Sequence, residues 1–279
     1  MLFFFLYIKL IKMTTKILEV KKPKHDSKVE LPEALVGLNP EKGFLLCFCS
    51  PSRSGKSNLI MNLLFNNFNQ KGKPYWRRII WVSPSCMHDE TLTGLREIDD
   101  EDYEINLICD VSNMEGVIQG IEDSLKESIN EDKEEGIKSI LILDDCVGMM
   151  KNVRKLEQLC SRYRHLNGMS MIITSQIFRG IPVMPRGNAT GWVLHLTHNQ
   201  ADRKKMEEEL SGKFKNFNEY YEEATQKPYN FLFCDMERSR LYKNFDDLLW
   251  SKEDYLKMLN TNKNETAKPD TLAKSSKRS

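Results

Sequence analysis

Residues 44–57 read Phe-Leu-Leu-Cys-Phe-Cys-Ser-Pro-Ser-Arg-Ser-Gly-Lys-Ser, an apolar run that leads directly into a glycine-lysine-serine triplet. The apolar part, Phe44 to Cys49, predicts a central parallel strand that is covered on both faces. The polar part matches the nucleoside-triphosphate loop G-x-x-x-x-G-K-[ST] at every fixed position but the first. Apolar residues then recur at helical spacing, so we expect the loop to open a helix whose N-terminus faces an anion. These apolar residues are Leu59, Ile60, Leu63 and Leu64.

Each fixed position of this loop motif has a physical role in holding a nucleotide. Gly55 lets the backbone approach the phosphates, Lys56 reaches the β- and γ-phosphates, and Ser57 places its hydroxyl on Mg²⁺. The departure is Ser50, which stands where the motif has glycine and tolerates the turn only with a negative φ. The candidate nucleotide-binding residues are Ser50, Pro51, Ser52, Arg53, Ser54, Gly55, Lys56 and Ser57.

A pair of acids forms the second chemical element of the sequence. Asp144 and Asp145 follow four aliphatic residues, Ile140 to Leu143, which places carboxylates at the end of a buried strand. Ligands gather at this edge of an open α/β sheet. We therefore expect Asp144 to hold Mg²⁺ through its water shell, and Asp145 to orient or deprotonate the attacking water. The alternative is that the two acids only cap a helix.

A polar residue also follows the apolar strand that is expected over residues 169–174. Gln176, at the tip of this strand, is a candidate to sense the γ-phosphate or to hold the lytic water. The alternative is a turn glutamine that bonds to the backbone. Because this strand comes after the strand of the acid pair, we expect it to lie between the two strands that carry the first two motifs.

Composition limits the possible functions. The chain has 279 residues, of which 40% are hydrophobic and 29% charged, and this suits one large α/β domain. The net charge of +1 gives no global attraction to nucleic acid, so any contact with DNA must be local. Seven cysteines lie mostly inside apolar runs, which predicts reduced, buried thiols rather than disulfides or a zinc site. They are Cys47, Cys49, Cys86, Cys109, Cys146, Cys160 and Cys234.

Strands and helices alternate along the chain, and this predicts an α/β fold with a central, mostly parallel sheet flanked by helices. We expect an N-terminal arm at 1–35, one nucleotide-binding domain at 36–259 and a disordered basic tail at 260–279. The apolar N-terminal stretch is too short to span a membrane. Further strands are expected at 78–83, 105–109, 139–143 and 192–196, and further helices at 114–125 and 151–165.

Five stretches together resemble the genome-packaging ATPases of large double-stranded DNA viruses, of poxvirus type, within the FtsK–HerA superfamily. The resemblance covers roughly residues 40–200 and implies a P-loop NTPase fold of the additional-strand type. The basic stretch before the glutamine strand and the Arg-x-Asn after it are more diagnostic than the phosphate loop. The five stretches are Ser50–Ser57, Leu141–Asp145, Arg162–Gly168, Thr174–Gln176 and Pro185–Thr190.

The resemblance also implies an arginine finger that one subunit supplies to the site of its neighbour. By position Arg164 matches this finger best, and Arg162 is a close rival. Arg179 and Arg186 follow the glutamine strand and could contact DNA, a neighbouring subunit or nothing. Two features depart from the family pattern. The loop lacks its first glycine, and Asp145 stands where many relatives carry glutamate.

The function implied by the resemblance is an ATP-driven DNA translocase that packages a viral genome, with ATP and Mg²⁺ as cofactors. Its implied partners are double-stranded DNA of any sequence, a homo-oligomeric ring of five or six subunits, and capsid proteins. The implied location is the viral factory in the host cytoplasm, and the virion. Two alternatives stay open: a P-loop nucleoside or small-molecule kinase, and a non-catalytic scaffold that responds to nucleotide. A GTPase is disfavoured because the sequence has no Asn-Lys-x-Asp element.

Overall fold

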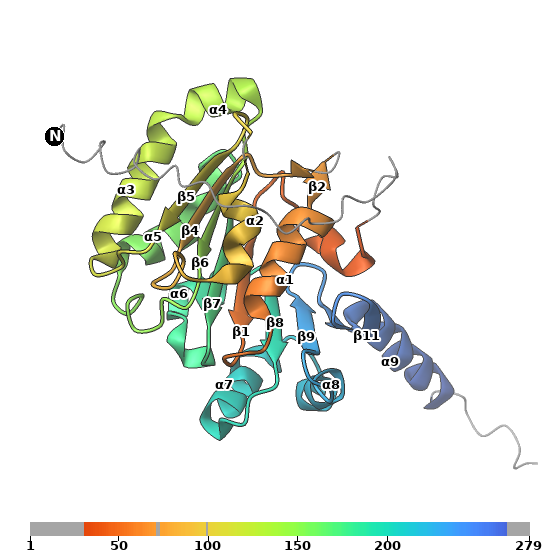
Figure 1. Cartoon of the computed structure of the whole chain (residues 1–279). Coiled ribbons are helices and arrows are strands. Elements are labelled where there is room, and N and C mark those ends of the chain that lie inside the picture. The colour runs from red at the N-terminus through yellow and green to blue at the C-terminus, as the bar shows by residue number, and fades with distance from the viewer. Residues whose placement is uncertain (1–30, 71–72, 99, 267–279) are drawn as a thin grey trace, which may run out of the picture.

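The computed structural model describes residues 31–70, 73–98 and 100–266. Within these ranges nine strands form one sheet in the order β11-β10-β9-β8-β1-β7-β6-β4-β5 (Figure 1). Neighbours from β8 to β5 are parallel, whereas β9, β10 and β11 continue the sheet in antiparallel fashion. The predicted α/β fold with a mostly parallel sheet is therefore confirmed. The strands are β1 (Leu45–Cys49), β4 (Arg78–Val82), β5 (Glu104–Ile108), β6 (Ser139–Leu143), β7 (Ser170–Ser175), β8 (Gly191–His195), β9 (Phe231–Asp235), β10 (Arg240–Lys243) and β11 (Asp247–Ser251).

The strand order places the predicted motifs at one edge of the sheet. β7 pairs with β1 on one side and with β6 on the other, all in parallel. The phosphate loop follows β1, the acid pair follows β6, and Gln176 follows β7. The predicted strand between the two motif-bearing strands is thus present, and the carboxyl ends of all three strands meet at the same edge of the sheet.

Helices cover both faces of the sheet, and β1 contributes side chains to both hydrophobic cores. Leu46 and Phe48 lie in one core with Ile60, while Leu45 and Cys47 lie in the other. Every residue of β1 is buried, as expected for a central strand. The first core is covered by α1 (Lys56–Asn62), its π-helical extension η2 (Leu63–Asn67) and α2 (Thr93–Arg96), and the second by α3 (Met114–Glu127), α5 (Arg154–Arg162), α7 (Gln200–Leu210) and α8 (Phe217–Ala224). The remaining elements are η1 (Glu33–Gly37), β2 (Asn69–Gln70), β3 (Lys73–Pro74), η3 (Glu90–Leu92), α4 (Ile129–Glu135), η4 (Tyr163–His165), η5 (Phe178–Gly180), α6 (Val183–Asn188) and α9 (Lys252–Thr266).

The folded domain begins earlier and ends later in the chain than the predicted bounds of 36–259. Ala34 and Leu35, in the short helix η1, are fully buried, so the domain begins before residue 36. α9 continues to Thr266, so residues 260–266 are helical rather than disordered. The rest of the predicted arm and tail, residues 1–30 and 267–279, lies outside the described residues. No helix in the described part of the chain combines the length and apolarity that a bilayer span requires.

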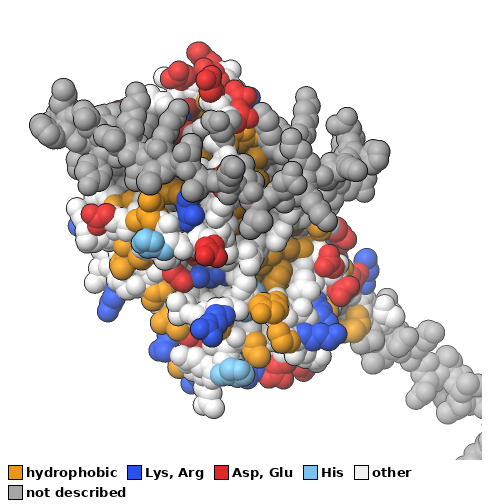
Figure 2. Space-filling view, in the orientation of Figure 1, with side chains coloured by type: hydrophobic (Ala, Val, Ile, Leu, Met, Phe, Trp, Pro, Cys, Tyr) orange, Lys and Arg blue, Asp and Glu red, His pale blue; other side chains and the backbone are white. Residues whose placement is uncertain are grey.

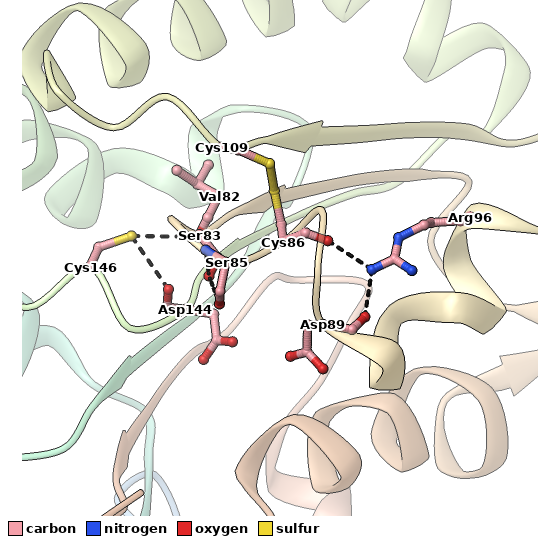
Figure 3. Close-up of a disulfide and its surroundings, with 9 residues drawn as sticks. All are labelled: Val82, Ser83, Ser85, Cys86, Asp89, Arg96, Cys109, Asp144 and Cys146. Atoms are coloured by element: carbon pink, nitrogen blue, oxygen red, sulfur yellow. Dashed lines mark hydrogen bonds between the residues drawn. A yellow bond between two sulfur atoms is a disulfide. The ribbon is translucent and has the colours of Figure 1, made fainter. Parts of the chain in front are cut away.

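The expectation that all cysteines are reduced is wrong for one pair. Cys86 and Cys109 form a disulfide between the loop after β4 and the residue that follows β5 (Figure 3). β4 and β5 are parallel neighbours, so their carboxyl ends meet although 23 residues separate the two cysteines. The pairing depends on this strand order, which cysteine spacing does not reveal. The other cysteines are free and buried: Cys47, Cys49, Cys146, Cys160 and Cys234.

Candidate nucleotide-binding site

The phosphate loop connects β1 to α1 at the carboxyl edge of the sheet. Gly55 forms the N-cap of α1 with φ 84°, a left-handed conformation that favours glycine. The Ser54 amide donates to the Pro51 carbonyl at 3.2 Å, and the Leu59 amide donates to the Gly55 carbonyl at 2.9 Å. Arg53 is also left-handed, with φ 64°. The backbone therefore makes the tight strand-to-helix turn that the motif predicts.

Ser50, the departure from the motif, is buried and does not have a positive φ, as the turn requires. Its Oγ lies 2.7 Å from Nδ1 of His195, the last residue of β8. The Tyr221 hydroxyl donates to the His195 carbonyl at 2.8 Å and accepts from the Thr197 amide at 2.9 Å. Burial lowers the pKa of His195 to about 4, so its ring is neutral near pH 7 and offers one acceptor nitrogen. The hydrogen bond between the Ser50 and His195 side chains thus links the first residue of the loop to β8.

The lysine of the loop and the acid pair after β6 lie together. Lys56 Nζ is 2.5 Å from Asp145 Oδ2 and 3.6 Å from Asp144 Oδ1. Thr174 Oγ1 donates to Asp144 Oδ1 at 2.6 Å and accepts from the Asp145 amide at 3.1 Å. The side chains of Lys56 and Asp144 are 11% and 4% exposed, and that of Asp145 is 28% exposed. Thr174 of β7 therefore positions both acids, a role that the sequence did not reveal.

Burial and nearby charges act in opposite directions on this cluster. Burial disfavours the charge on Lys56, but Asp144 and Asp145 outweigh it and raise the lysine pKa. Burial raises the pKa of Asp144, although Lys56 and the Thr174 hydroxyl pull it down. The charge of Asp89 also raises the Asp144 pKa, and Figure 3 shows the two carboxylates pointing to the same side. The role of Asp89 was not predicted from the sequence. Asp89 follows the strand predicted at 78–83, and the carboxyl end of that strand reaches this edge of the sheet.

Oxygen atoms suited to Mg²⁺ lie next to Lys56. Asp145 Oδ1 is buried and has no hydrogen-bond partner among the described residues. The Asp145 backbone has φ 54°, a strained conformation that persists only where the surroundings hold it. Ser57 lies in the first turn of α1, directly after Lys56. Mg²⁺ is usually held by one or two carboxylates together with substrate phosphates, so the Asp144 carboxylate beside Lys56, together with the Ser57 hydroxyl, fits it. No group of three or more His, Cys, Asp or Glu side chains suited to a metal occurs within the described residues.

Gln176 lies at the expected edge of the sheet, and it forms no hydrogen bond with either of the two acids, all three being described residues. It directly follows β7 and its side chain is exposed. The preceding residue, Ser175, accepts a backbone hydrogen bond from Ser50 at 2.9 Å, so the strand that carries Gln176 borders the phosphate loop. The action of Gln176 on the γ-phosphate or on water stays a prediction.

Arg164 lies at the opposite edge of the sheet from the phosphate loop. It belongs to η4, which precedes β7, and it donates to Glu237 at 2.8 Å and to the Tyr163 hydroxyl at 3.1 Å. Its side chain is 46% exposed. β7 spans about 17 Å, which keeps Arg164 out of the site of its own subunit. The rival Arg162 is held at 2.6 Å by Glu122, whose side chain is fully buried.

The Pro185–Thr190 stretch has a structural role within the chain. Arg186 is only 8% exposed, and two of its nitrogens bind the Glu209 carboxylate at 3.0 Å each. Thr190 Oγ1 accepts from the Leu45 amide at 3.0 Å and donates to the Leu45 carbonyl at 3.1 Å, at the start of β1. Arg179 is more exposed and forms an ion pair at 3.3 Å with a buried carboxylate of α7. Of the two arginines, only Arg179 leaves much of its side chain accessible.

Comparison with known families decides the relationship of the chain. A family model described as "Poxvirus A32 protein" matches residues 40–261, most of the chain. The chain belongs to the poxvirus A32 protein family. The match confirms the poxvirus-type family that the five sequence stretches indicate. No curated protein sequence matches it.

Solved structures of viral packaging proteins share the fold of this A32-family member. The genome packaging NTPase B204 from Sulfolobus turreted icosahedral virus 2, in complex with ATP-gammaS, matches with a TM-score of 0.53 and 16% identity over 75% of this chain and 100% of its own. The AMPPCP complex of that protein gives 0.53 and 17%, over 74% and 98%. The DNA-packaging ATPase B204 from Sulfolobus Turreted Icosahedral Virus gives 0.52 and 16%, over 73% and 98%. At these identities the comparison establishes the shared fold.

Proposed function

We propose that this chain hydrolyses ATP to move double-stranded DNA into a viral capsid. The observation that carries the proposal is the position of Lys56 against Asp144 and Asp145, at the edge where the phosphate loop opens α1. Membership in the poxvirus A32 family supports the packaging role. So does the fold shared with viral proteins described as genome packaging NTPases.

ATP and Mg²⁺ would be held by the backbone of the loop and by three side chains, two from the loop and one from the end of β6. Lys56 would bind the β- and γ-phosphates, and Ser57 and Asp144 would provide the oxygens that hold the ion. When bound, Mg²⁺ neutralises the charge that develops on the phosphate oxygens. Lys56 and Asp144 are nearly buried, so their charges act with little screening by water.

Asp145 is the residue best placed to act on the attacking water. One of its oxygens contacts Lys56, and the other is buried and unpartnered among the described residues, so it can accept a hydrogen bond from water. A carboxylate in this position orients the nucleophile and takes its proton. Gln176, at the end of the neighbouring strand, would help to hold the same water.

The active assembly would be a ring of five or six subunits, with hydrolysis at the interfaces between them. Arg164 lies far from the site of its own subunit and is half exposed, so it could stabilise the transition state only in a neighbour's site. The Glu237 carboxylate that binds it would have to release it on assembly. The ring would act in the viral factory of the host cytoplasm, and with capsid proteins in the virion.

Contact with DNA would involve local groups rather than the whole surface. The net charge is +1, and on the face shown in Figure 2 Lys and Arg side chains are interspersed with Asp and Glu. Acidic side chains gather at the top of this view, over α4. Binding through phosphate contacts would be indifferent to sequence and would weaken steeply with salt.

The rate of ATP hydrolysis by the purified full chain tests the catalytic part of the proposal. Lys56→Ala removes the charge that faces the γ-phosphate, and such losses cost roughly 10²–10³ in rate. Lys133→Ala, an exposed lysine of α4, is the matched control and should keep the wild-type rate. Circular dichroism would confirm that both variants are folded. Full activity of Lys56→Ala would contradict the assignment, and binding of ATP without turnover by the wild type would favour a scaffold.

A further inference from the structure

Tyr229 has an unusual position in the turn between α8 and β9. The Asn230 amide donates to the Lys227 carbonyl at 3.1 Å, which closes a four-residue turn with Pro228 and Tyr229 at its centre. Tyr229 has φ 66°, and 71% of its surface is exposed. Proline followed by a residue with positive φ is the pattern of a type II turn, whose third position normally takes glycine or asparagine. A tyrosine here strains the backbone and leaves an aromatic ring in solvent, so neither turn geometry nor core packing accounts for it.

The ring lies against the phosphate loop. A methyl group on the Gly55 Cα would come within 3.4 Å of Tyr229 Cδ1. β9 begins beside the end of β8, where His195 pairs with Phe231, and β8 in turn adjoins β1 (Figure 1). Tyr229 is therefore held at the carboxyl edge of the parallel strands, next to Gly55, the N-cap of α1.

The strand order also gives the direction of a nucleotide in this site. Lys56, Asp144 and Asp145 would meet the terminal phosphate, and the two acids lie after β6, on the β7 side of β1. Tyr229 comes from the β9 side. If the γ-phosphate of a nucleotide lies at the two acids, the nucleoside extends away from β6 and toward β9, the strand that follows Tyr229.

We propose that the Tyr229 ring stacks on the purine base of the nucleotide held by the phosphate loop. This inference rests on the proposed function, because it assigns the base end of the same site. Stacking on an aromatic ring tolerates any base but is stronger for the larger purines. Tyr229 would thus favour ATP and GTP over CTP and UTP without distinguishing the first two.

Binding of ATP, CTP and inorganic tripolyphosphate to the full chain, measured by calorimetry with Mg²⁺, tests this proposal. Tyr229→Gly should weaken ATP binding roughly tenfold or more, weaken CTP binding less, and leave tripolyphosphate binding unchanged. The same variant should have an unchanged or higher Tm, because glycine accepts the left-handed backbone without strain. Tyr229→Phe should bind ATP as the wild type does.

Ser239→Gly is the matched control. Ser239 is also left-handed, with φ 55°, in the turn between β9 and β10 at the far edge of the sheet, so its replacement relieves similar strain without affecting any ligand. An equal loss of tripolyphosphate and ATP binding in Tyr229→Gly would overturn the proposal, because the ring would then support the loop rather than the base. Unchanged ATP affinity in Tyr229→Gly would also overturn the proposal. The exposed ring would then be a candidate to contact a neighbouring subunit or DNA instead. A wild type that binds neither ATP nor tripolyphosphate would refute the proposed function itself.

Discussion

His195 makes the stability of the protein depend on pH in a defined direction. Burial lowers its pKa from 6.5 to about 4 in the folded chain, whereas the unfolded chain keeps a value near 6.5. Between these two values the unfolded chain binds a proton that the folded chain does not. The free energy of unfolding therefore falls as the pH drops through this window, by up to about 3 kcal/mol from this group, and the full contribution is present above the unfolded value.

Urea unfolding at a series of pH values between about 4.5 and 7.5 would measure this slope. His195→Gln should flatten it, because the titrating group is gone. His88→Gln, an exposed histidine in the loop after β4, should keep the wild-type slope. The same slope in His195→Gln as in the wild type would show that other groups cause the pH dependence.

Single residues were predictable where a local motif specifies them. Lys56, Asp144 and Asp145 were expected to act together, and the structure brings them within ion-pair distance. The hydrogen bond between Ser50 and His195 was not predictable, because 145 residues separate the two and only the pairing of β1 with β8 joins them. Partners that depend on strand order leave no local signal in the sequence.

At the scale of elements, the Cys86–Cys109 disulfide ties the loop after β4 to the end of β5. It closes a loop with a sequence separation of 23 residues, and a cross-link of this size stabilises a fold by about 3 kcal/mol in the chain-entropy model. Dithiothreitol should therefore lower the Tm of the wild type in a thermal unfolding experiment.

The double variant Cys86→Ser with Cys109→Ser should unfold at the temperature of the reduced wild type, and dithiothreitol should not change it. Cys160→Ser, which removes a buried free thiol instead, should keep its sensitivity to the reductant. A wild-type Tm that does not respond to dithiothreitol would show that the two cysteines are not cross-linked in solution.

The elements of the parallel sheet were predictable, and those of its antiparallel extension were not. Strands expected at 78–83, 105–109, 139–143 and 192–196 are all present, because continuous apolar runs mark buried strands. β9, β10 and β11 were missed because short turns without glycine or proline join them. Ser239 and Asn244 supply the left-handed positions of those turns. α9 was missed because it lacks a strong apolar stripe, and it leaves Leu256 and Met258 exposed.

At the scale of the whole molecule, the position of Arg164 predicts that activity requires contact between subunits. Arg164→Ala and Lys56→Ala should each be nearly inactive alone, because a trans-acting arginine contributes 10³–10⁵ in rate. Mixing the two variants creates interfaces that pair an intact loop with an intact arginine, so phosphate release should partly return. Arg154→Ala mixed with Lys56→Ala controls for the effect of mixing an inactive variant with another one, because Arg154 lies at the start of α5 and has no proposed role in hydrolysis. A mixture that co-assembles but stays inactive would place Arg164 in a structural role with Glu237.

The most direct test of an ATP-driven DNA translocase is phosphate release by the full chain with and without double-stranded DNA. We expect duplexes of unrelated sequence to stimulate hydrolysis equally, and the stimulation to rise more than linearly with protein concentration and to fall steeply with salt. Lys56→Ala should show no stimulation. Hydrolysis that is unaffected by DNA at every protein concentration, or phosphate transfer to a small-molecule acceptor in place of water, would contradict the account.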